Sequence, residues 1–428
     1  MVRRFRGFLG RVTFGCLIMV SIASAQTVDN NPLSKQEVME QIAEVLSKEA
    51  FVPGLDFTKW PEMVKKEQKQ IDEAKNDDEF QRAINAALRK FGATHIVLNS
   101  PRIADLRSNG STVGVGISSQ RTPDGLLITR TISDAPAERA GIVAGDVVTA
   151  VDGNQVAGAA AIAGREGSDV TLTIRHADGK SEDYILTRRR YSTLRPEELT
   201  WVDKDTVKIA IYTFDYAYDR ERISRFMKEA SSAKNLILDL RDNGGGLISN
   251  FRSLLGYFVE PTKPLGTFID RKMVEDFVTA TKGSVTDLPS IARWSPRKLR
   301  SIPDESISIF KGHVVVLVNG ISGSASEIIA EGLRDTIGAT IVGTKSAGAV
   351  LVSKYVPVTN GFMLQYPLSD YVSIRGIRLE GVGVLPDVTV SGPKLLPPSV
   401  PDPVVKKAVE IFSAATGSNG HDYGEKRS

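Results

Sequence analysis

Cysteine is nearly absent from this chain of 428 residues, and histidine is scarce. The single cysteine, Cys16, lies in the first 25 residues, and the histidines are His95, His176, His313 and His421. Without a cysteine beyond residue 25, that part of the chain forms no disulfide and offers neither a thiol nucleophile nor a thiolate metal ligand. Its chemistry therefore depends on hydroxyl, carboxylate, amine and imidazole groups.

The sequence also lacks an apolar run of the roughly 20 residues that a membrane-spanning helix needs. Its N-terminus reads as a basic stretch, "MVRRFRGFLGR", a shorter apolar stretch, "VTFGCLIMVSIA", and then Ala23-Ser24-Ala25. This order is typical of a secretory signal peptide that is cleaved after an A-x-A site. We predict a signal peptide over residues 1–25, an exported protein in the periplasm or outside the cell, and no stable membrane anchor.

Without the predicted signal peptide, the chain has no excess of basic residues. The whole chain has 54 Lys and Arg against 51 Asp and Glu, and four of the arginines lie in residues 1–25. The remaining balance is close to neutral, which does not favour nucleic acid as a partner. A hydrophobic content of 41% and a charged content of 25% are ordinary for a globular protein.

The spacing of apolar residues divides the chain after the leader into four parts. Helical spacing dominates residues 26–110, whereas residues 111–190 alternate between short strands and turns. Residues 195–395 alternate strands such as "NLILDL" and "HVVVLVNG" with helices, which indicates an α/β layer with mostly parallel strands. Within that part, residues 250–305 predict an irregular insertion or lid. We expect residues 396–428 to form a tail with one short helix and a disordered end.

Residues 111–190 contain a pattern that suits peptide capture. The stretch "GVGI", comprising Gly114, Val115, Gly116 and Ile117, precedes "DAPAERAGIVAGDVVTAVDG" and together with it resembles a bacterial PDZ domain. The two glycines let backbone amides turn toward a ligand carboxylate, and the strand that follows offers an open edge for an added peptide strand. We predict that these four residues bind proteins or peptides with free C-termini.

A cluster of serines marks a possible catalytic turn. In "VLVNGISGSASEIIAEGL", Ser322, Ser324 and Ser326 lie between a predicted strand and a predicted helix. Such a turn lifts one side chain above the sheet, beside helix amides that can stabilise an oxyanion. Ser324 and Glu327 also match the S-x-x-E capping box, a purely structural feature of helix starts. The turn alone therefore leaves a nucleophile and a helix cap as alternatives.

Three motifs extend this pattern. The stretches "DLRDNGG", "GSASE" and "EGVGVLPD", behind a PDZ-like segment, resemble the tail-specific, or C-terminal processing, serine peptidases over about residues 35–395. The resemblance implies a crotonase-like (ClpP-like) α/β peptidase core with an inserted PDZ domain and an N-terminal helical segment. It implies Ser324 as the nucleophile, the amides of Gly245 and Ala325 as oxyanion donors, and neither cofactor nor metal.

The general base of that family is missing. Its lysine lies in "TFGKG", twenty-five residues after the serine, where this chain has "SAGAV" with Ala349. A methyl group cannot accept a proton. Lys345 and Lys354 flank the position, but an offset of four or five residues displaces a side chain by several ångströms and makes them weaker candidates.

A related branch, which resembles the tricorn core protease, uses serine, histidine and glutamate instead. Its histidine follows a hydroxyl residue, as His95 follows Thr94 in "FGATHIVL", and its glutamate precedes the closing motif, as Glu380 does. His95 could act as general base, Glu380 could orient the imidazole, and Thr94 could hydrogen-bond the carboxylate. The alternatives are a structural histidine after a helix and a structural glutamate, since the same ending occurs in lysine-type members.

Three functional classes fit these patterns. The first is an exported serine endopeptidase that acts on unfolded or tail-presented proteins. The second is a catalytically inactive peptidase fold that binds peptides through its PDZ groove, which the missing lysine favours. The third is a carrier of small apolar ligands, because crotonase-like cores hold such ligands in some relatives.

Overall fold

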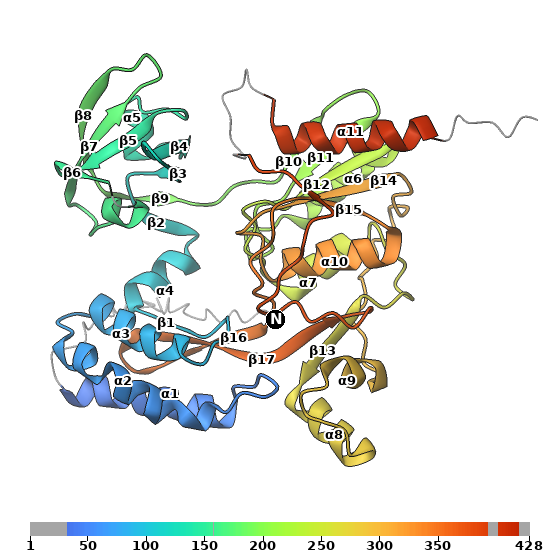
Figure 1. The fold of residues 1–428 in the computed structure, drawn as a ribbon, viewed down its shortest axis with the longest axis horizontal. Helices are drawn as coiled ribbons and strands as arrows, with labels where there is room; N and C mark the ends of the chain where they lie inside the picture. The colour runs from blue at the N-terminus through green and yellow to red at the C-terminus, as the bar shows by residue number, and fades with distance from the viewer. Residues whose placement is uncertain (1–31, 157, 393–400, 419–428) are drawn as a thin grey trace, which may run out of the picture.

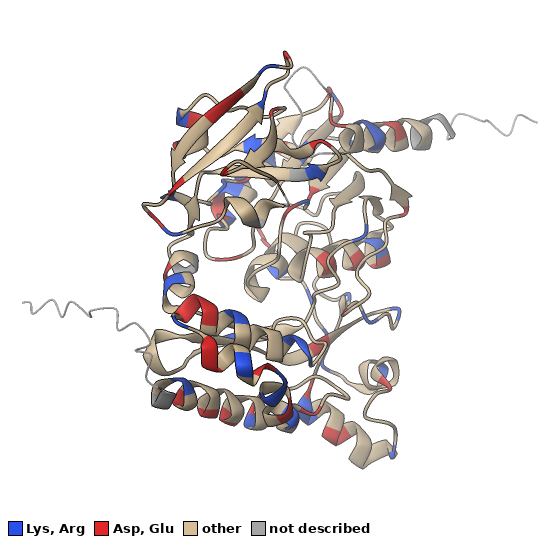
Figure 2. Cartoon of the chain, turned by 60° about the vertical axis from the view of Figure 1, so that its left-hand side comes forward, with Lys and Arg blue, Asp and Glu red and all other residues tan. Residues whose placement is uncertain are grey.

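The computed structural model describes residues 32–156, 158–392 and 401–418. The predicted signal peptide and the final residues of the predicted disordered tail lie outside these ranges. Among the helices that the structure describes, none combines the length and the apolar character needed to cross a membrane. In the view of Figure 2, the positions of basic and acidic residues are interspersed along the N-terminal helices.

The N-terminal part consists of helices with one short strand. Helix α3 illustrates why they form: Asn76 caps its first turn by accepting a hydrogen bond from the Glu79 amide at 3.0 Å, and Phe80, Ile84 and Leu88 line its buried face. The elements are α1 (Pro32–Lys48), η1 (Phe57–Lys59), α2 (Trp60–Glu73), α3 (Asp77–Arg89), β1 (Val97–Asn99) and α4 (Pro101–Ser108).

The PDZ-like part forms a separate body at the upper left of Figure 1, with its own apolar core. Its sheet has the order β3-β4-β5-β7-β8, with β6 on β5, and a ribbon of β2 and β9 joins it to the remainder. The elements are β2 (Ser111–Gly114), β3 (Ile117–Thr122), β4 (Gly125–Thr131), α5 (Pro136–Arg139), β5 (Val147–Val151), β6 (Asn154–Gln155), η2 (Ala159–Ile162), β7 (Asp169–Arg175), β8 (Ser181–Thr187) and β9 (Arg189–Ser192).

A six-stranded sheet organises the C-terminal half. Its order is β10-β11-β12-β14-β15-β18, and every pair is parallel except β10 with β11. The elements around it are β10 (Glu198–Trp201), β11 (Thr206–Ala210), α6 (Arg220–Glu229), η3 (Ala230–Ser232), β12 (Asn235–Asp239), α7 (Ile248–Leu255), β14 (His313–Val318), α10 (Ala325–Ile337), β15 (Thr340–Gly343), β18 (Val388–Thr389) and α11 (Pro403–Ser418).

Alternate residues of the central strands serve two apolar layers. Leu236 and Leu238 of β12 pack into the layer that contains α7 and α10, whereas Ile237 between them packs into the layer of α11. Helices therefore cover both faces of the sheet, as a parallel sheet requires. In Figure 1, α11 crosses the sheet at the upper right and α10 lies below it.

A second, antiparallel sheet joins distant parts of the chain. Strand β17 (Met363–Ser373) pairs with β1, with β16 (Val352–Pro357) and with β13 (Gly266–Asp270). The η4 turn (Thr359–Gly361) lies between β16 and β17. Because β1 begins two residues after the predicted base His95, its pairing with β17 brings the N-terminal part to the peptidase-like core.

The prediction of an irregular segment over residues 250–305 is wrong. This segment contains the end of α7, strand β13, and the helices α8 (Arg271–Thr281) and α9 (Leu288–Trp294). Asp270 caps α8 by accepting from the Met273 amide at 2.8 Å, and Phe277 and Ile291 pack in one buried cluster. The helices are short, and β13 is stabilised by β17, about 100 residues further along the chain, so the regular structure of this segment depends on distant contacts.

Candidate active site

Ser324 occupies a strained turn between β14 and α10. Its backbone angles, φ 53° and ψ −113°, are rare for a residue with a side chain. Gly245 approaches the turn so closely that a Cβ atom placed on it would lie 2.7 Å from Ser324 Cβ and 3.0 Å from the Ala325 nitrogen. Only glycine fits that position. Strain of this kind is concentrated at functional sites, where the surroundings hold it in place.

The neighbouring serines have structural partners. The Ser322 hydroxyl donates to the Leu240 carbonyl at 2.9 Å and accepts from the Asn319 amide at 2.9 Å. The Ser326 hydroxyl donates to the Asn243 carbonyl at 2.9 Å. Both side chains are fully buried, whereas Ser324 is half-buried and lines a cavity. Of the three hydroxyl groups, that of Ser324 is the one placed to meet a substrate.

The cavity at Ser324 also contains His95. Its volume is about 840 Å³, and its wall includes the glycine stretch that begins at Gly244. Apolar side chains form much of the remainder of the wall, among them Phe251, Phe268, Ile328, Val350 and Leu351. His95 and Ser324, which are 229 positions apart in the sequence, thus line one cavity. Within the described residues, no group of His, Cys, Asp and Glu side chains is arranged to hold a metal ion.

Thr94 connects His95 to Glu380. Its hydroxyl lies 3.0 Å from Glu380 Oε2 and 2.8 Å from His95 Nδ1, and its amide donates to Glu380 Oε1 at 3.0 Å. Since a hydroxyl has one proton and the carboxylate can only accept, Thr94 donates to Glu380 and accepts from His95 Nδ1–H. That tautomer leaves Nε2 of His95 unprotonated, which is the form a general base needs.

The two predicted oxyanion donors are in different situations. Ala325 is the first residue of α10, so its amide has no carbonyl partner within the helix. The Gly245 amide already donates to Asn243 Oδ1 at 2.9 Å. Gly245 is therefore close to the serine as expected, but its N–H group has a buried side-chain acceptor in this structure.

Glu327 has a larger role than the helix cap that the sequence indicated. Its carboxylate is fully buried and accepts from the amides of Ser324 at 3.0 Å, Gly348 at 2.7 Å and Ala349 at 2.9 Å, and from the Ser346 hydroxyl. Burial raises the pKa of Glu327 above its usual value, although these hydrogen bonds act in the opposite direction. The carboxylate thus fastens the loop over residues 346–349 to the serine turn.

The same loop is held at its other end by Glu380. The Val350 amide donates to Glu380 Oε2 at 2.9 Å, on the oxygen that also receives the Thr94 hydroxyl. The loop around Ala349, where the resemblance led us to look for a lysine, therefore links the serine turn to the Thr94 and Glu380 pair. Nothing local in the sequence indicates this, because the amide donors belong to residues of no distinctive type.

Neither flanking lysine is arranged as a base. Lys354 lines the cavity, but its Nζ lies 2.6 Å from Glu49 Oε2 and 5.3 Å from the centre of the Tyr366 ring. The Lys345 side chain is exposed.

The predicted peptide-binding residues occupy the start of an edge strand. Ile117 opens β3, which pairs with β4 alone among the described strands, and Gly114 pairs with Arg189 in the β2–β9 ribbon. Gly116 has φ 79°, and a Cβ atom there would lie 2.0 Å from Ala135 Cβ, so glycine is required. Val115 is buried, and its carbonyl accepts from the Ala137 amide at 2.8 Å.

Comparisons with known proteins match two separate parts of the chain. Residues 205–390 match peptidase family S41, and residues 127–176 match the PDZ domain. A probable CtpA-like serine protease of Staphylococcus haemolyticus is 29% identical over 296 residues, and one of Staphylococcus aureus is 30% identical over 293 residues. Each alignment covers 67% of this chain and 54% of the relative, so the chain spans about half the length of these curated relatives.

Solved structures agree in fold over most of the chain. The photosystem II D1 C-terminal processing protease superposes with a TM-score of 0.51 at 23% identity, covering 85% of this chain and 95% of that one. Mature CPAF superposes with a TM-score of 0.59 at 14% identity, covering 91% and 99%. At such identities the agreement concerns the fold alone.

Proposed function

Because this chain carries a peptidase family S41 domain together with a PDZ domain, we propose that it is an exported serine endopeptidase. It would hydrolyse peptide bonds of unfolded or tail-presented proteins. One observation carries the proposal: Ser324 and His95 line one cavity, and Thr94 connects His95 to Glu380. We also propose that the core is crotonase-like, or ClpP-like, which the mostly parallel sheet with helices on both faces supports. Export rests on the leader pattern of residues 1–25.

The proposed mechanism follows from these contacts. His95 Nε2 takes the proton of the Ser324 hydroxyl as its oxygen attacks the scissile carbonyl. The imidazolium that forms is stabilised through Thr94 by the negative charge of Glu380. The carbonyl oxygen becomes an oxyanion that the Ala325 amide stabilises, joined by the Gly245 amide when the latter shares or releases its bond to Asn243.

The second half of the reaction uses the same groups. His95 returns the proton to the leaving amine, which breaks the peptide bond and leaves an acyl group on Ser324. A water molecule then attacks the acyl carbonyl while His95 takes its proton. The bond between the acyl carbon and the Ser324 oxygen breaks, His95 gives the proton to that oxygen, and the new carboxyl end leaves. Every proton is carried by His95, so the mechanism needs no lysine at residue 349.

A fluorophosphonate probe tests the proposed function most directly. It reacts with an activated serine, so the full-length protein is expected to gain one covalent adduct, and mass mapping is expected to place it on Ser324. The absence of an adduct on folded protein that still binds peptides would identify an inactive, peptide-binding fold instead.

Replacing Glu327 by glutamine is expected to lower kcat by about 10- to 100-fold with little change in KM. The carboxamide would turn an NH₂ group toward amide donors, and each buried hydrogen bond lost in this way costs about 1–3 kcal/mol. The measurement is steady-state hydrolysis of an unfolded protein substrate. Glu331→Gln is the matched control, since this buried carboxylate lies one turn further along α10 and accepts from Arg375 at 3.0 Å. Equal losses in both variants would show that Glu327 stabilises the fold and has no specific effect on turnover.

Peptides with a free C-terminus are expected to bind the PDZ domain at least tenfold more tightly than their amidated forms. A carboxylate accepts charge-assisted hydrogen bonds from the amides near Gly116, and losing them costs about 1.5–3 kcal/mol. Titration of the full-length Ser324→Ala protein would measure this without cleavage of the peptide. Affinities that do not depend on amidation would remove the carboxylate from the recognition mode.

A further inference from the structure

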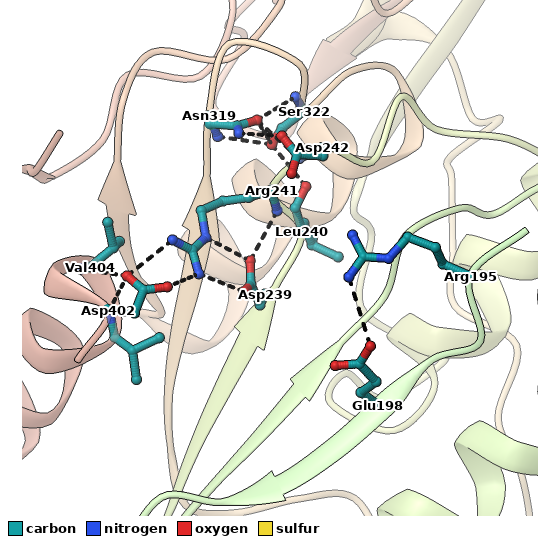
Figure 3. Close-up of polar contacts among 11 residues, drawn as sticks. Arg195, Glu198, Asp239, Leu240, Arg241, Asp242, Asn319, Ser322, Asp402 and Val404 are labelled. Carbon is teal, nitrogen blue, oxygen red and sulfur yellow. Dashed lines mark hydrogen bonds and ion pairs between the residues drawn. The ribbon is translucent and has the colours of Figure 1, made fainter. Parts of the chain in front are cut away.

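Arg241 lies at the centre of an ion-pair cluster behind the candidate active site. Its side chain is 3% exposed, with Nε and Nη2 bound to Asp239 at 2.9 and 2.7 Å, and with Nη1 and Nη2 bound to Asp402 at 3.2 and 2.6 Å. Figure 3 shows the guanidinium held between the two carboxylates. Burial lowers the pKa of Arg241, but the bonds to Asp239 and Asp402 outweigh it and hold the pKa above its ordinary value. The guanidinium is therefore a permanent positive charge that binds one carboxylate on each of two sides.

Asp402 directly precedes the C-terminal helix α11. Besides Arg241, its Oδ1 accepts from the Val404 amide at 2.9 Å and the Val405 amide at 3.3 Å, so it caps the start of α11. The helix buries Val404, Ala408 and Phe412 against the outer face of β12, β14 and β15. Asp402 thus fixes where α11 begins and attaches that point to the segment after β12.

The residues on either side of Arg241 hold the turn of the serine. The Leu240 carbonyl accepts from Ser322, and the Asn243 carbonyl accepts from the Gly323 amide at 3.0 Å and from the Ser326 hydroxyl at 2.9 Å. Figure 3 also shows Asp242 paired with Asn319, through bonds of 3.0 and 2.7 Å. Segment 240–243 is therefore bonded to residues 319–326 on one side and, through Arg241 alone among these contacts, to α11 on the other.

This arrangement has a consequence for catalysis. Gly244 joins this segment to Gly245, where a Cβ atom would lie 2.7 Å from Ser324 Cβ, and the Asn243 side chain holds the Gly245 amide. A displacement of about 1 Å in such a segment alters reactive geometry enough to lower turnover strongly. We propose that α11 is a built-in activator, in which the Asp402–Arg241 pair positions segment 240–245 and, through it, Ser324 and its oxyanion site. Arg241 and Asp402 are positioning residues, and this inference rests on the proposed peptidase function.

Asp402→Asn separates the ion pair from the helix cap, because asparagine caps a helix as well as aspartate does. The full-length variant is expected to lose at least tenfold in kcat while KM stays within about twofold, and to react with the fluorophosphonate more slowly by the same factor. Asp402→Glu keeps the charge and is expected to retain most of the activity. Glu197→Gln is the stability control, since it weakens another ion pair of a buried carboxylate, with Arg222 at 3.1 Å, in the same part of the chain.

Hydrogen exchange supplies a readout that does not require activity. The amides of Gly323 and Ser326 are expected to exchange at least tenfold faster in Asp402→Asn than in the wild type or in Glu197→Gln. Wild-type exchange and turnover in Asp402→Asn, or equal losses in Glu197→Gln, would overturn the positioning role. Faster exchange in Asp402→Asn, together with a wild-type protein that neither hydrolyses substrate nor reacts with the probe, would overturn the peptidase function and leave the structural coupling intact.

Discussion

Ser324→Ala is expected to abolish hydrolysis of an unfolded protein substrate, with a loss in kcat of about 10⁴-fold or more. The hydroxyl is the group that would form the bond to the scissile carbonyl, and neither of the other two serines of this turn is placed to replace it. Ser322 and Ser326 are buried and bonded to the carbonyls of Leu240 and Asn243. Initial rates with casein, together with a far-ultraviolet spectrum to verify folding, would measure the effect.

Two serine variants control for this result. Ser326→Ala removes a buried hydroxyl from the same turn, but the Asn243 carbonyl keeps the Gly323 amide as a donor, so a modest loss of stability with near wild-type activity is expected. Ser353→Ala removes a hydroxyl that lines the same cavity without belonging to the turn. Full activity in Ser324→Ala, with loss in Ser326→Ala, would show that a different hydroxyl is the nucleophile.

His95→Ala is expected to lower kcat by about 10³- to 10⁴-fold, because an unassisted serine hydroxyl is a poor nucleophile. Glu380→Gln and Thr94→Val are expected to lose less, since they act on His95 through one hydroxyl rather than on the substrate. Wild-type activity is expected to rise with pH over the range in which histidine side chains lose their proton, and that rise should disappear in His95→Ala. Measuring kcat and kcat/KM across this range checks both expectations.

Lys354→Ala is the matched control for the base. Lys354 lines the same cavity as His95, but it pairs with Glu49, so its removal is expected to leave turnover near the wild-type value. A folded His95→Ala protein with wild-type activity and an unchanged pH profile would exclude His95, and a large loss in Lys354→Ala would then identify the amine as the base.

The sequence alone determined the features that depend on local chemistry. The strand–turn–helix pattern around Ser324 predicts a raised side chain at a helix start, and the structure has β14, a strained Ser324 and α10 there. The PDZ-like and peptidase-like motifs were also readable, because glycine at positions such as Gly116 and Gly245 is imposed by the close approach of a neighbouring residue, Ala135 and Ser324 respectively. The sequence reading failed over residues 250–305, where short helices pack in one cluster with Val372 of β17, a strand distant in sequence.

Tertiary structure alone decided which of these groups meet. Thr94 and Glu380 are 286 residues apart, and they are brought together by the pairing of β1 with β17, in which Val97 lies opposite Gln365. The residues of the 346–350 loop, whose amides bind Glu327 and Glu380, are unremarkable as amino acids and were identified only by their partners. The Asp402–Arg241 pair spans 161 residues. A side chain's chemistry is a local property, whereas its hydrogen-bond partner is selected by packing of the whole chain. The turn at Ser324 could therefore be predicted from the sequence, and the contacts that position it could not.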